Sequence, residues 1–182
     1  MNMNHKDEVI KDWNSNPMRK PRIASVCINI CVGTSGEPLE KAIRILETLT
    51  GQKPSRRKAK RTIRSFGIHK GEPIACMVTV RGKRAYEILD RVSQAVGREI
   101  RKSSFDKNGN FGFGIEEHID IPGMKYDPEI GIYGMNVYVT LERPGYRVKR
   151  RRIKKHKIGS KHRITRDEAI IFAEEVLGFK VK

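Results

Sequence analysis

The residue types that most often bind metals or catalyse reactions are sparse in this sequence. Cys27 and Cys31 lie four residues apart in an alternating stretch. Four residues of strand span roughly 13 Å, which is too far for two ligands of one tetrahedral zinc. Residues 116–120 contain three acids and a histidine, but in a strand these side chains point alternately to opposite faces. The spacing therefore predicts no metal site.

Two glycine-rich stretches could in principle bind phosphate groups. VGTSGE at residues 32–37 and GNFGFG at residues 109–114 both lack the Gly-Lys-Ser/Thr ending of a phosphate-binding loop. The sequence also offers no Ser-His-Asp or Cys-His pairing to propose. We expect no cofactor and no catalytic residue, so an RNA-modifying enzyme stays open only through residues that the fold brings together.

Positive charge is the strongest chemical signal in the chain. Its 182 residues carry a formal net charge of +17, and nearly all of the excess lies in two runs without an acid, GQKPSRRKAKR (51–61) and RVKRRRIKKHKIGSKHR (147–163). Like charges this dense repel one another, so each run needs water or a polyanion around it. We predict that both runs face the phosphates of a nucleic acid. The residues predicted to bind phosphate in the second run are Lys149, Arg150, Arg151, Arg152, Lys154, Lys155, Lys157, Lys161 and Arg163.

A membrane is the other polyanion to consider, and the sequence argues against it. Neither basic run is an amphipathic helix with a bulky apolar face, and no apolar stretch approaches the ~20 residues of a spanning helix. The start, MNMNHKDEVIKDW, lacks the apolar middle of a secretory signal, and three cysteines suit a reducing compartment. We expect a protein inside the cell that has no membrane partner.

Periodicity indicates where the first half of the chain forms helices and strands. A weak helix is expected near residues 7–13, and RIASVCINICVG alternates as a strand with one buried face. A stripe of apolar residues from Leu39 to Leu49 predicts a helix that stops at Gly51. Pro54 and the solvated cations after it predict a loop or an irregular extension rather than a continued helix. A second strand is expected at residues 74–80, with residues 63–68 as its hairpin partner across the turn HKGEP.

The second half of the chain continues in the same mixed pattern. Residues 83–96 read as a helix, and Asn108-Gly109 is a hairpin turn before a strand at residues 111–115. MNVYVTLER gives a last strand, and Thr165 has capping-box spacing for a helix at residues 166–177. Strands and helices without strict alternation predict an α+β fold, with a largely antiparallel sheet and helices on one face, as a single RNA-binding domain over residues 1–182.

The other face of the predicted sheet is mixed rather than plainly polar. A solvated face is one reading, and a face covered by RNA is favoured by the basic runs beside it. A general nucleic-acid packaging protein is a second alternative, and it would bind double-stranded DNA as tightly as structured RNA. The side chains expected on this face are Ser25, Cys27, Asn29, Met77, Thr79, Arg81 and Tyr138.

Five ordered blocks resemble a known family. TGQKP, KAKRTIRSFGI, PIACMVTVRG, SFDKNGNFGFGIEEHI and YGMNV are similar to the ribosomal protein five family of the large subunit, over about residues 19–179. RPGYRVKRR and KHRITRDEA resemble its archaeal and eukaryotic branch. Bacterial relatives carry a longer block before the SFD motif, where this chain has only GREIRKS. The binding residues of that block are therefore not transferred.

The resemblance implies a non-catalytic protein bound to ribosomes in the cytoplasm. It implies binding of 5S ribosomal RNA, anchored in the central protuberance, through Asn29, Gln52, Phe66, Thr79 and Arg81, although Phe66 could instead be a core aromatic. The loop at residues 51–61 would reach peptidyl-site transfer RNA, through Lys53, Pro54, Ser55, Arg56, Arg57 and Lys58. Without apolar anchors, we expect residues 53–58 to be mobile in the absence of that RNA. Other implied partners are large-subunit ribosomal RNA, a neighbouring 5S-binding protein and a small-subunit head protein across an intersubunit bridge.

Overall fold

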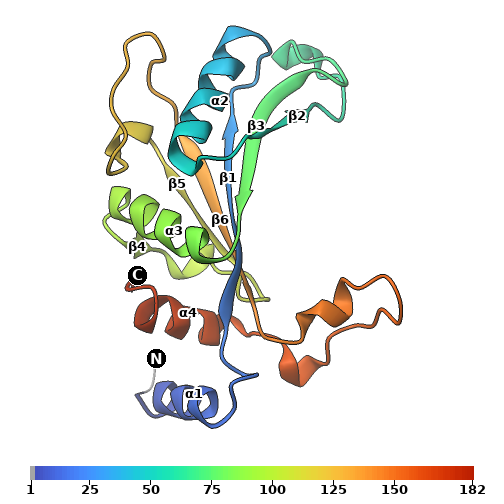
Figure 1. Ribbon diagram of the computed structural model, residues 1–182, viewed down its shortest axis with the longest axis vertical. Coiled ribbons are helices and arrows are strands. Elements are labelled where there is room, and N and C mark those ends of the chain that lie inside the picture. The colour runs from blue at the N-terminus through green and yellow to red at the C-terminus, as the bar shows by residue number, and fades with distance from the viewer. Residues whose placement is uncertain (1–2) are drawn as a thin grey trace. The chain divides into compact units, whose positions relative to one another are not determined.

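The computed structural model describes residues 3–182, and side chains from residue 5 onward. The chain divides into two compact units, which are described separately. Unit 1 consists of Met1–Ala24, Glu99–Phe111 and Val139–Lys182, and unit 2 of Ser25–Arg98 and Gly112–Tyr138. Helices and strands are mixed along the chain without strict alternation, so the predicted α+β class is confirmed (Figure 1).

The main sheet has the strand order β2-β3-β1-β6-β5. Its strands are β1 (Arg22–Cys31), β2 (Ser55–Lys58), β3 (Pro73–Val80), β5 (Phe111–Ile115) and β6 (Met135–Glu142). β1 and β3 are antiparallel, with Val26 opposite Val80 and Cys31 opposite Ala75. β2 is antiparallel to β3. The largely antiparallel character expected from the sequence is confirmed.

Two helices of unit 2 supply its apolar layer. They are α2 (Glu37–Thr50) and α3 (Lys83–Ala95), drawn on the same side of β1 and β3 (Figure 1). The stripe predicted for α2 is buried from Leu39 to Leu49, and β1 buries every second residue from Val26 to Ile30. α2 ends at Gly51, whose φ of 62° suits glycine and whose N–H donates to the Glu47 carbonyl at 2.7 Å.

The prediction that residues 55–58 lie in a loop is wrong. Ser55–Lys58 form the edge strand β2, hydrogen-bonded to β3, although all four side chains are exposed. Residues 63–68, predicted to pair with β3, instead close on themselves through an Ile63–Ile68 bridge. Alternation of apolar and polar residues reveals a strand only when one of its faces is buried. β2 has no buried face, so its sequence shows no such alternation. Basic side chains on such an edge also discourage pairing with another chain.

Unit 1 packs two helices around aromatic side chains. α4 (Arg166–Glu175) packs against β7 (Lys180–Val181), which forms a short parallel pair with β4 (Glu99–Ile100). The other helix of this unit is α1 (Met3–Ser15). Trp13 contacts Phe172 edge to face, with 6.3 Å between ring centroids. α4 begins at Arg166 as predicted, after the N-cap Thr165, whose hydroxyl accepts from the Glu168 N–H at 3.3 Å. It ends two residues earlier than predicted, where the Phe179 N–H turns back to the Ala173 carbonyl.

Short 3-10 helices connect these elements. They span Arg64–Phe66, Lys102–Ser104, His118–Asp120, Tyr146–Lys149 and Ser160–His162. The Asn108-Gly109 turn forms as predicted, with the Asp106 N–H donating to the Asn110 carbonyl at 2.8 Å. Within residues 3–182, no helix has the length and apolar character needed to cross a bilayer.

Candidate nucleic-acid interface

The face of the sheet opposite α2 and α3 carries a row of short side chains. The register places Asn29 of β1 beside Met77 of β3, and Met77 beside Ser55 of β2. One step along the sheet, Cys27 lies opposite Thr79. Side chains at cross-strand positions stand about 5 Å apart, so this row forms a continuous surface.

The predicted face residues differ from the core residues in exposure. Asn29, Met77 and Thr79 are half-buried and Arg81 is exposed, whereas Val26 is fully buried. The alternation therefore assigned these faces correctly. Small hydroxyl, amide and thioether groups allow an RNA backbone or an unstacked base to approach closely.

Tyr138 extends this open surface on β6. Its side chain is 52% exposed and lies against Gly112 of β5. A Cβ at Gly112 would stand 2.8 Å from Tyr138 Cδ1, so only glycine leaves room for the ring there. The alternation had placed Tyr138 on this face, but its support by Gly112 was not visible in the sequence.

β2 and β3 continue into a long hairpin tip at residues 59–72. Ala59 exchanges backbone hydrogen bonds with Gly71 and Glu72, and the Ile63–Ile68 bridge narrows the tip. Phe66 lies at this tip and is 72% exposed, which rules out the alternative that it is a core aromatic. The tip therefore presents an exposed aromatic ring in a segment that also exposes Arg61, Arg64 and Lys70.

Glu72 fixes the base of this hairpin. One carboxylate oxygen accepts from the His69 N–H at 3.0 Å and the other from the Ser35 hydroxyl at 2.7 Å. These bonds, the His69 N–H first, lower the pKa of Glu72 and favour its charged form. Gln52, another predicted site residue, is half-buried just after α2 and donates its N–H to the Thr50 hydroxyl at 3.3 Å.

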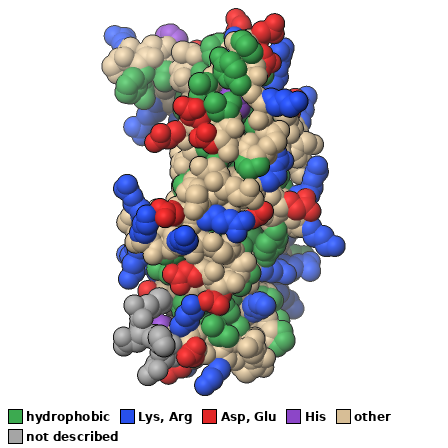
Figure 2. Space-filling view, turned by 90° about the vertical axis from the view of Figure 1, so that its left-hand side faces the viewer, with side chains coloured by type: hydrophobic (Ala, Val, Ile, Leu, Met, Phe, Trp, Pro, Cys, Tyr) green, Lys and Arg blue, Asp and Glu red, His purple; other side chains and the backbone are tan. Residues whose placement is uncertain are grey.

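Few cations of the two basic runs have an acidic partner. Arg56 pairs with Glu40 at 2.7 Å, and Arg150 pairs with Glu142 at 2.5 Å. The other Lys and Arg residues of residues 51–61 and 147–163 form no salt bridge within the described part of the chain. Elsewhere basic and acidic side chains lie among one another, as Figure 2 shows for one face. Most of the positive charge of the two runs is therefore not neutralised by acidic side chains of the described residues.

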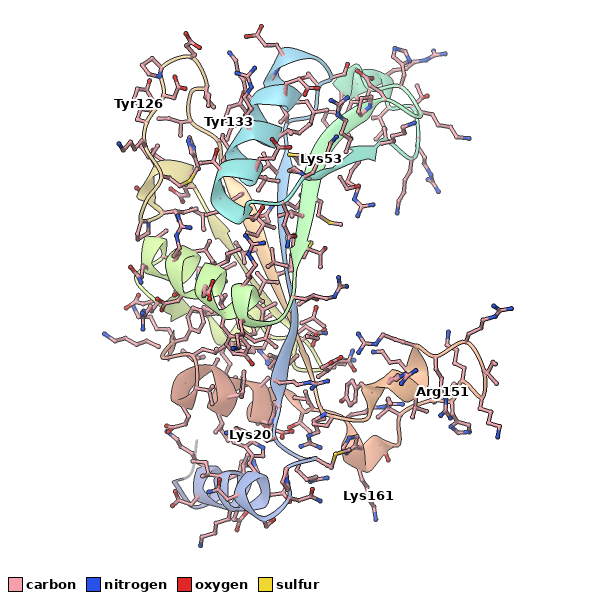
Figure 3. The ribbon with its side chains drawn as sticks, viewed as in Figure 1. Lys20, Lys53, Tyr126, Tyr133, Arg151 and Lys161 are labelled. Atoms are coloured by element: carbon pink, nitrogen blue, oxygen red, sulfur yellow. The ribbon has the colours of Figure 1, made fainter. Side chains whose placement is uncertain are left out.

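The second basic run, residues 147–163, forms a segment of unit 1 that has two short 3-10 helices and no strand. The His156 N–H donates to the Val148 carbonyl at 3.2 Å, and Arg151 Nε donates to the Lys154 carbonyl at 2.7 Å. Figure 3 shows side chains of this segment, with Arg151 and Lys161 labelled, projecting outward from its ribbon. The backbone is thus ordered by its own hydrogen bonds while the charged ends face solvent.

The remaining reactive side chains include the buried Cys76 and His118. Within the described residues, no group of three His, Cys, Asp or Glu side chains is placed to hold a metal ion. Burial raises the pKa of the Cys76 thiol to about 11, which keeps it protonated at neutral pH. Burial likewise lowers the pKa of His118, so this histidine favours its neutral form.

Comparison with known proteins adds an independent line of argument. Residues 16–69 match the family model of ribosomal protein L5, and residues 73–172 match the model for the C-terminus of the same ribosomal family. The large ribosomal subunit protein uL5 of Aeropyrum pernix is 54% identical over 172 residues, which cover 94% of this chain and 90% of the relative. The same protein of Nanoarchaeum equitans is 55% identical over 166 residues, covering 91% and 98%. That of Methanococcus vannielii is 49% identical over 172 residues, covering 93% and 95%.

Proposed function

The chain belongs to the ribosomal protein L5 family, and from this premise we propose that the open sheet face of unit 2 binds 5S ribosomal RNA. Membership of the family makes the chain a structural, non-enzymatic component of the large ribosomal subunit, located on the ribosome. We propose 5S ribosomal RNA as its ligand and the side chains of the open sheet face as the binding residues.

One observation carries the proposal: the continuous open row of Asn29, Met77 and Ser55, with Thr79 and Arg81 beside it. A charged face would bind any phosphate backbone, but short polar groups next to a thioether give a surface that discriminates by shape. In this mechanism, the sheet face fixes the register on a folded RNA loop. The unpaired cations add affinity by releasing counterions from the RNA.

Residues 51–61, which include β2, are the part of unit 2 proposed to contact peptidyl-site transfer RNA. Strand β2 is hydrogen-bonded to β3, so the basic side chains of Arg57 and Lys58 are presented from a paired strand. Phe66, at the tip of the same β2–β3 hairpin, offers a ring on which a base or a sugar of 5S ribosomal RNA can stack. This arrangement supports the contact that the family resemblance implies, with a strand in place of the expected loop at residues 55–58.

Further partners are proposed from other surfaces. The segment at residues 147–163 suits large-subunit ribosomal RNA because its cations are unpaired apart from Arg150. The loop before β6 exposes Tyr126 by 57%, labelled in Figure 3, and the same loop exposes Ile132 by 53%. Exposed aromatic and aliphatic side chains favour a protein partner. The small-subunit head protein at an intersubunit bridge and the neighbouring 5S-binding protein are the partners we propose for apolar surfaces of this kind.

Filter binding with 5S ribosomal RNA and a scrambled RNA of equal length tests the sheet face. Thr79→Trp places a bulky ring on the open face, and we expect at least a ten-fold loss of affinity for 5S RNA with little change for the scrambled RNA. Thr48→Trp is the matched control, because Thr48 is exposed on α2 at the helical side. Circular dichroism confirms that both variants fold.

Two outcomes would contradict this assignment. Equal losses for both RNAs would mean that the face contributes no discrimination. Competition by double-stranded DNA as strong as by 5S RNA would favour a general packaging protein instead.

A further inference from the structure

A pocket in unit 1 lies outside the proposed 5S-binding face. It has a volume of about 450 Å³ and is formed by the turn at residues 106–110, the end of β6 and the basic segment at residues 147–163. Pockets that hold small molecules range from about 300 to 1,000 Å³. The volume is therefore large enough for a single organic group and exceeds what one bare phosphate needs.

The rim of this pocket is cationic and has no counter-charge. Lys149, Lys155, Lys157 and Arg163 line it, and none of its lining residues is an Asp or Glu. In the described part of the chain, none of these four side chains belongs to a salt bridge; Arg163 Nε donates to the Ile158 carbonyl at 3.3 Å. Four cations around one cavity repel one another, and an anionic ligand relieves that repulsion.

The walls of the pocket are not those of a simple anion site. Leu141 and Ile164 are buried behind it, and Ile158 is half-buried in it. The rings of Tyr146 and His156 complete the lining. An inorganic phosphate gains nothing from aliphatic and aromatic walls, whereas a planar base gains stacking on such rings.

The Tyr146 ring is fixed before any ligand arrives. Its hydroxyl accepts from the Ile164 N–H and donates to the His162 carbonyl, each at 3.2 Å. Lys149 Nζ lies 5.6 Å from the centroid of the same ring, which places a cation next to an aromatic surface. A fixed ring loses little conformational entropy on binding, so the wall is preorganised.

One end of the pocket carries polar side chains. Asn110 is already committed, because its amide accepts from the Leu141 N–H at 3.3 Å and donates to Asp106 at 2.8 Å. The side chains of Asn108 and Thr140 make no internal hydrogen bond in the described part of the chain. An amide and a hydroxyl can both donate to and accept from the edge of a base.

We propose that this pocket binds one unpaired nucleotide of RNA, with its phosphate against the lysine and arginine side chains and its base between the aromatic and aliphatic walls. Asn108 and Thr140 meet the edge of that base. The inference rests on the proposed function only in taking RNA as the source of the nucleotide. In this proposal, the basic segment at residues 147–163 does more than contact successive phosphates. It forms one wall of a site that binds a nucleotide extruded from the RNA.

Titration of the full chain with the four nucleoside monophosphates, followed by amide chemical shifts in nuclear magnetic resonance, tests the proposal. We expect saturable shifts at Asn108, Tyr146 and Ile158, with at least ten-fold tighter binding than inorganic phosphate. A single-stranded trinucleotide should move the same amides, whereas a blunt RNA duplex at equal phosphate concentration should leave Asn108 and Ile158 unmoved. Equal shifts and affinity for phosphate alone, or shifts of these amides by the duplex, would overturn the proposal.

Two variants separate the pocket from the general charge of the segment. Ile158→Glu places an acid on the pocket wall and should weaken mononucleotide binding at least ten-fold. Ile153→Glu adds the same charge in the same run, but Ile153 is 74% exposed and does not line the pocket, so binding should change less than two-fold. Equal weakening by both variants would reduce the site to long-range electrostatics and overturn the proposal.

The Thr79→Trp variant tests the proposed sheet face independently of the pocket. Thr79→Trp should leave the mononucleotide titration unchanged, because Thr79 belongs to unit 2. If that variant lowers 5S selectivity while wild-type chain fails to bind nucleotides, only the pocket is refuted. If nucleotides bind and 5S selectivity is insensitive to Thr79→Trp, only the sheet-face proposal is refuted.

Discussion

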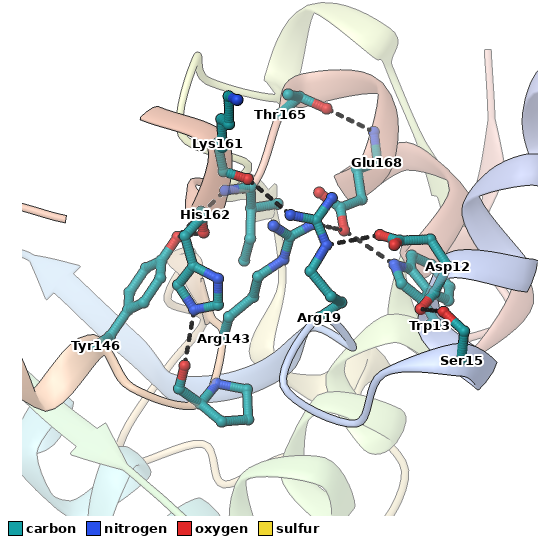
Figure 4. Close-up of polar contacts among 12 residues, drawn as sticks. Asp12, Trp13, Ser15, Arg19, Arg143, Tyr146, Lys161, His162, Thr165 and Glu168 are labelled. Carbon is teal, nitrogen blue, oxygen red and sulfur yellow. Dashed lines mark hydrogen bonds and ion pairs between the residues drawn. The ribbon is translucent and has the colours of Figure 1, made fainter. Parts of the chain in front are cut away.

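The buried pair of Arg143 and Glu168 provides the sharpest test of the energetics in unit 1. Their side chains are 3% and 7% exposed, and they hydrogen-bond to each other (Figure 4). Glu168 also accepts from Trp13 Nε1 at 2.9 Å. Arg143 Nε and Nη1 have no hydrogen-bond partner among the described residues. The Glu168 carboxylate therefore accepts two hydrogen bonds, while two of the three guanidinium nitrogens of Arg143 lack a hydrogen-bond partner among the described residues.

Glu168→Met should destabilise unit 1 strongly because it leaves the Arg143 charge buried without a partner. Removing one member of a buried pair costs about 3–5 kcal/mol. The double variant Arg143→Met/Glu168→Met removes both charges and loses mainly the bond from Trp13, which is worth about 1 kcal/mol. We therefore expect the double variant to be at least about 2 kcal/mol more stable than Glu168→Met alone.

Urea unfolding followed by tryptophan fluorescence measures these differences. Trp13 is the only tryptophan of the chain and is buried beside Glu168, so its emission reports this cluster directly. With a slope of about 2 kcal/mol per molar urea, a cost of 3–5 kcal/mol lowers the midpoint by about 1.5–2.5 M. Glu175→Met is the control, because its 2.5 Å pair with Lys6 is exposed and screened by solvent, so the urea midpoint should move far less than for Glu168→Met.

Two results would refute this reasoning. A loss below about 1 kcal/mol for Glu168→Met would mean that the Arg143 charge is solvated after the change. Additive losses in the double variant would mean that the two side chains stabilise the unit independently rather than as a pair.

The remaining predictions concern charge, pH and thiol reactivity. Replacing Arg152 and Lys154 by Gln should reduce the salt dependence of RNA binding by about 0.7–0.9 log units for each phosphate that the chain no longer neutralises. The depressed pKa of His118 means that the unfolded chain binds the proton more tightly, so stability should fall as pH drops below about 6.5, with a slope of at most about 1.4 kcal/mol per pH unit. Cys76 is buried with its pKa raised to about 11, so iodoacetamide at pH 8 should alkylate the exposed Cys31 much faster.

Each of these predictions has its own control. An unchanged slope in salt titrations would exclude phosphate binding by Arg152 and Lys154. His118→Asn should remove the pH-dependent part of urea stability between pH 7 and pH 5; a slope that persists would assign it to other groups. Alkylation of Cys76 as fast as that of Cys31, read by peptide mass mapping, would show that β3 opens readily in solution.

The open sheet face shows which site residues the alternation of apolar and polar residues could predict. Alternation in two strands assigned Asn29, Thr79 and Arg81 to the face opposite the core, because each strand reports its own burial. It did not give the register that sets Asn29 beside Met77, since pairing depends on which two strands meet. Gln52 and Phe66 entered through the family resemblance, and only the structure showed that Phe66 is exposed.

The sequence by itself determined the α+β class, the helices at residues 37–50 and 83–95, and the concentration of positive charge in two runs. These follow from local patterns of apolar and charged residues. The tertiary structure alone decided that Ser55–Lys58 form an edge strand and that Asn108 and Ile158 line one pocket. The backbone hydrogen bonds that join β2 to β3 do not depend on side-chain type, so no residue pattern predicts them. Asn108 and Ile158 are about fifty positions apart, so the pocket forms only when folding brings these two segments together.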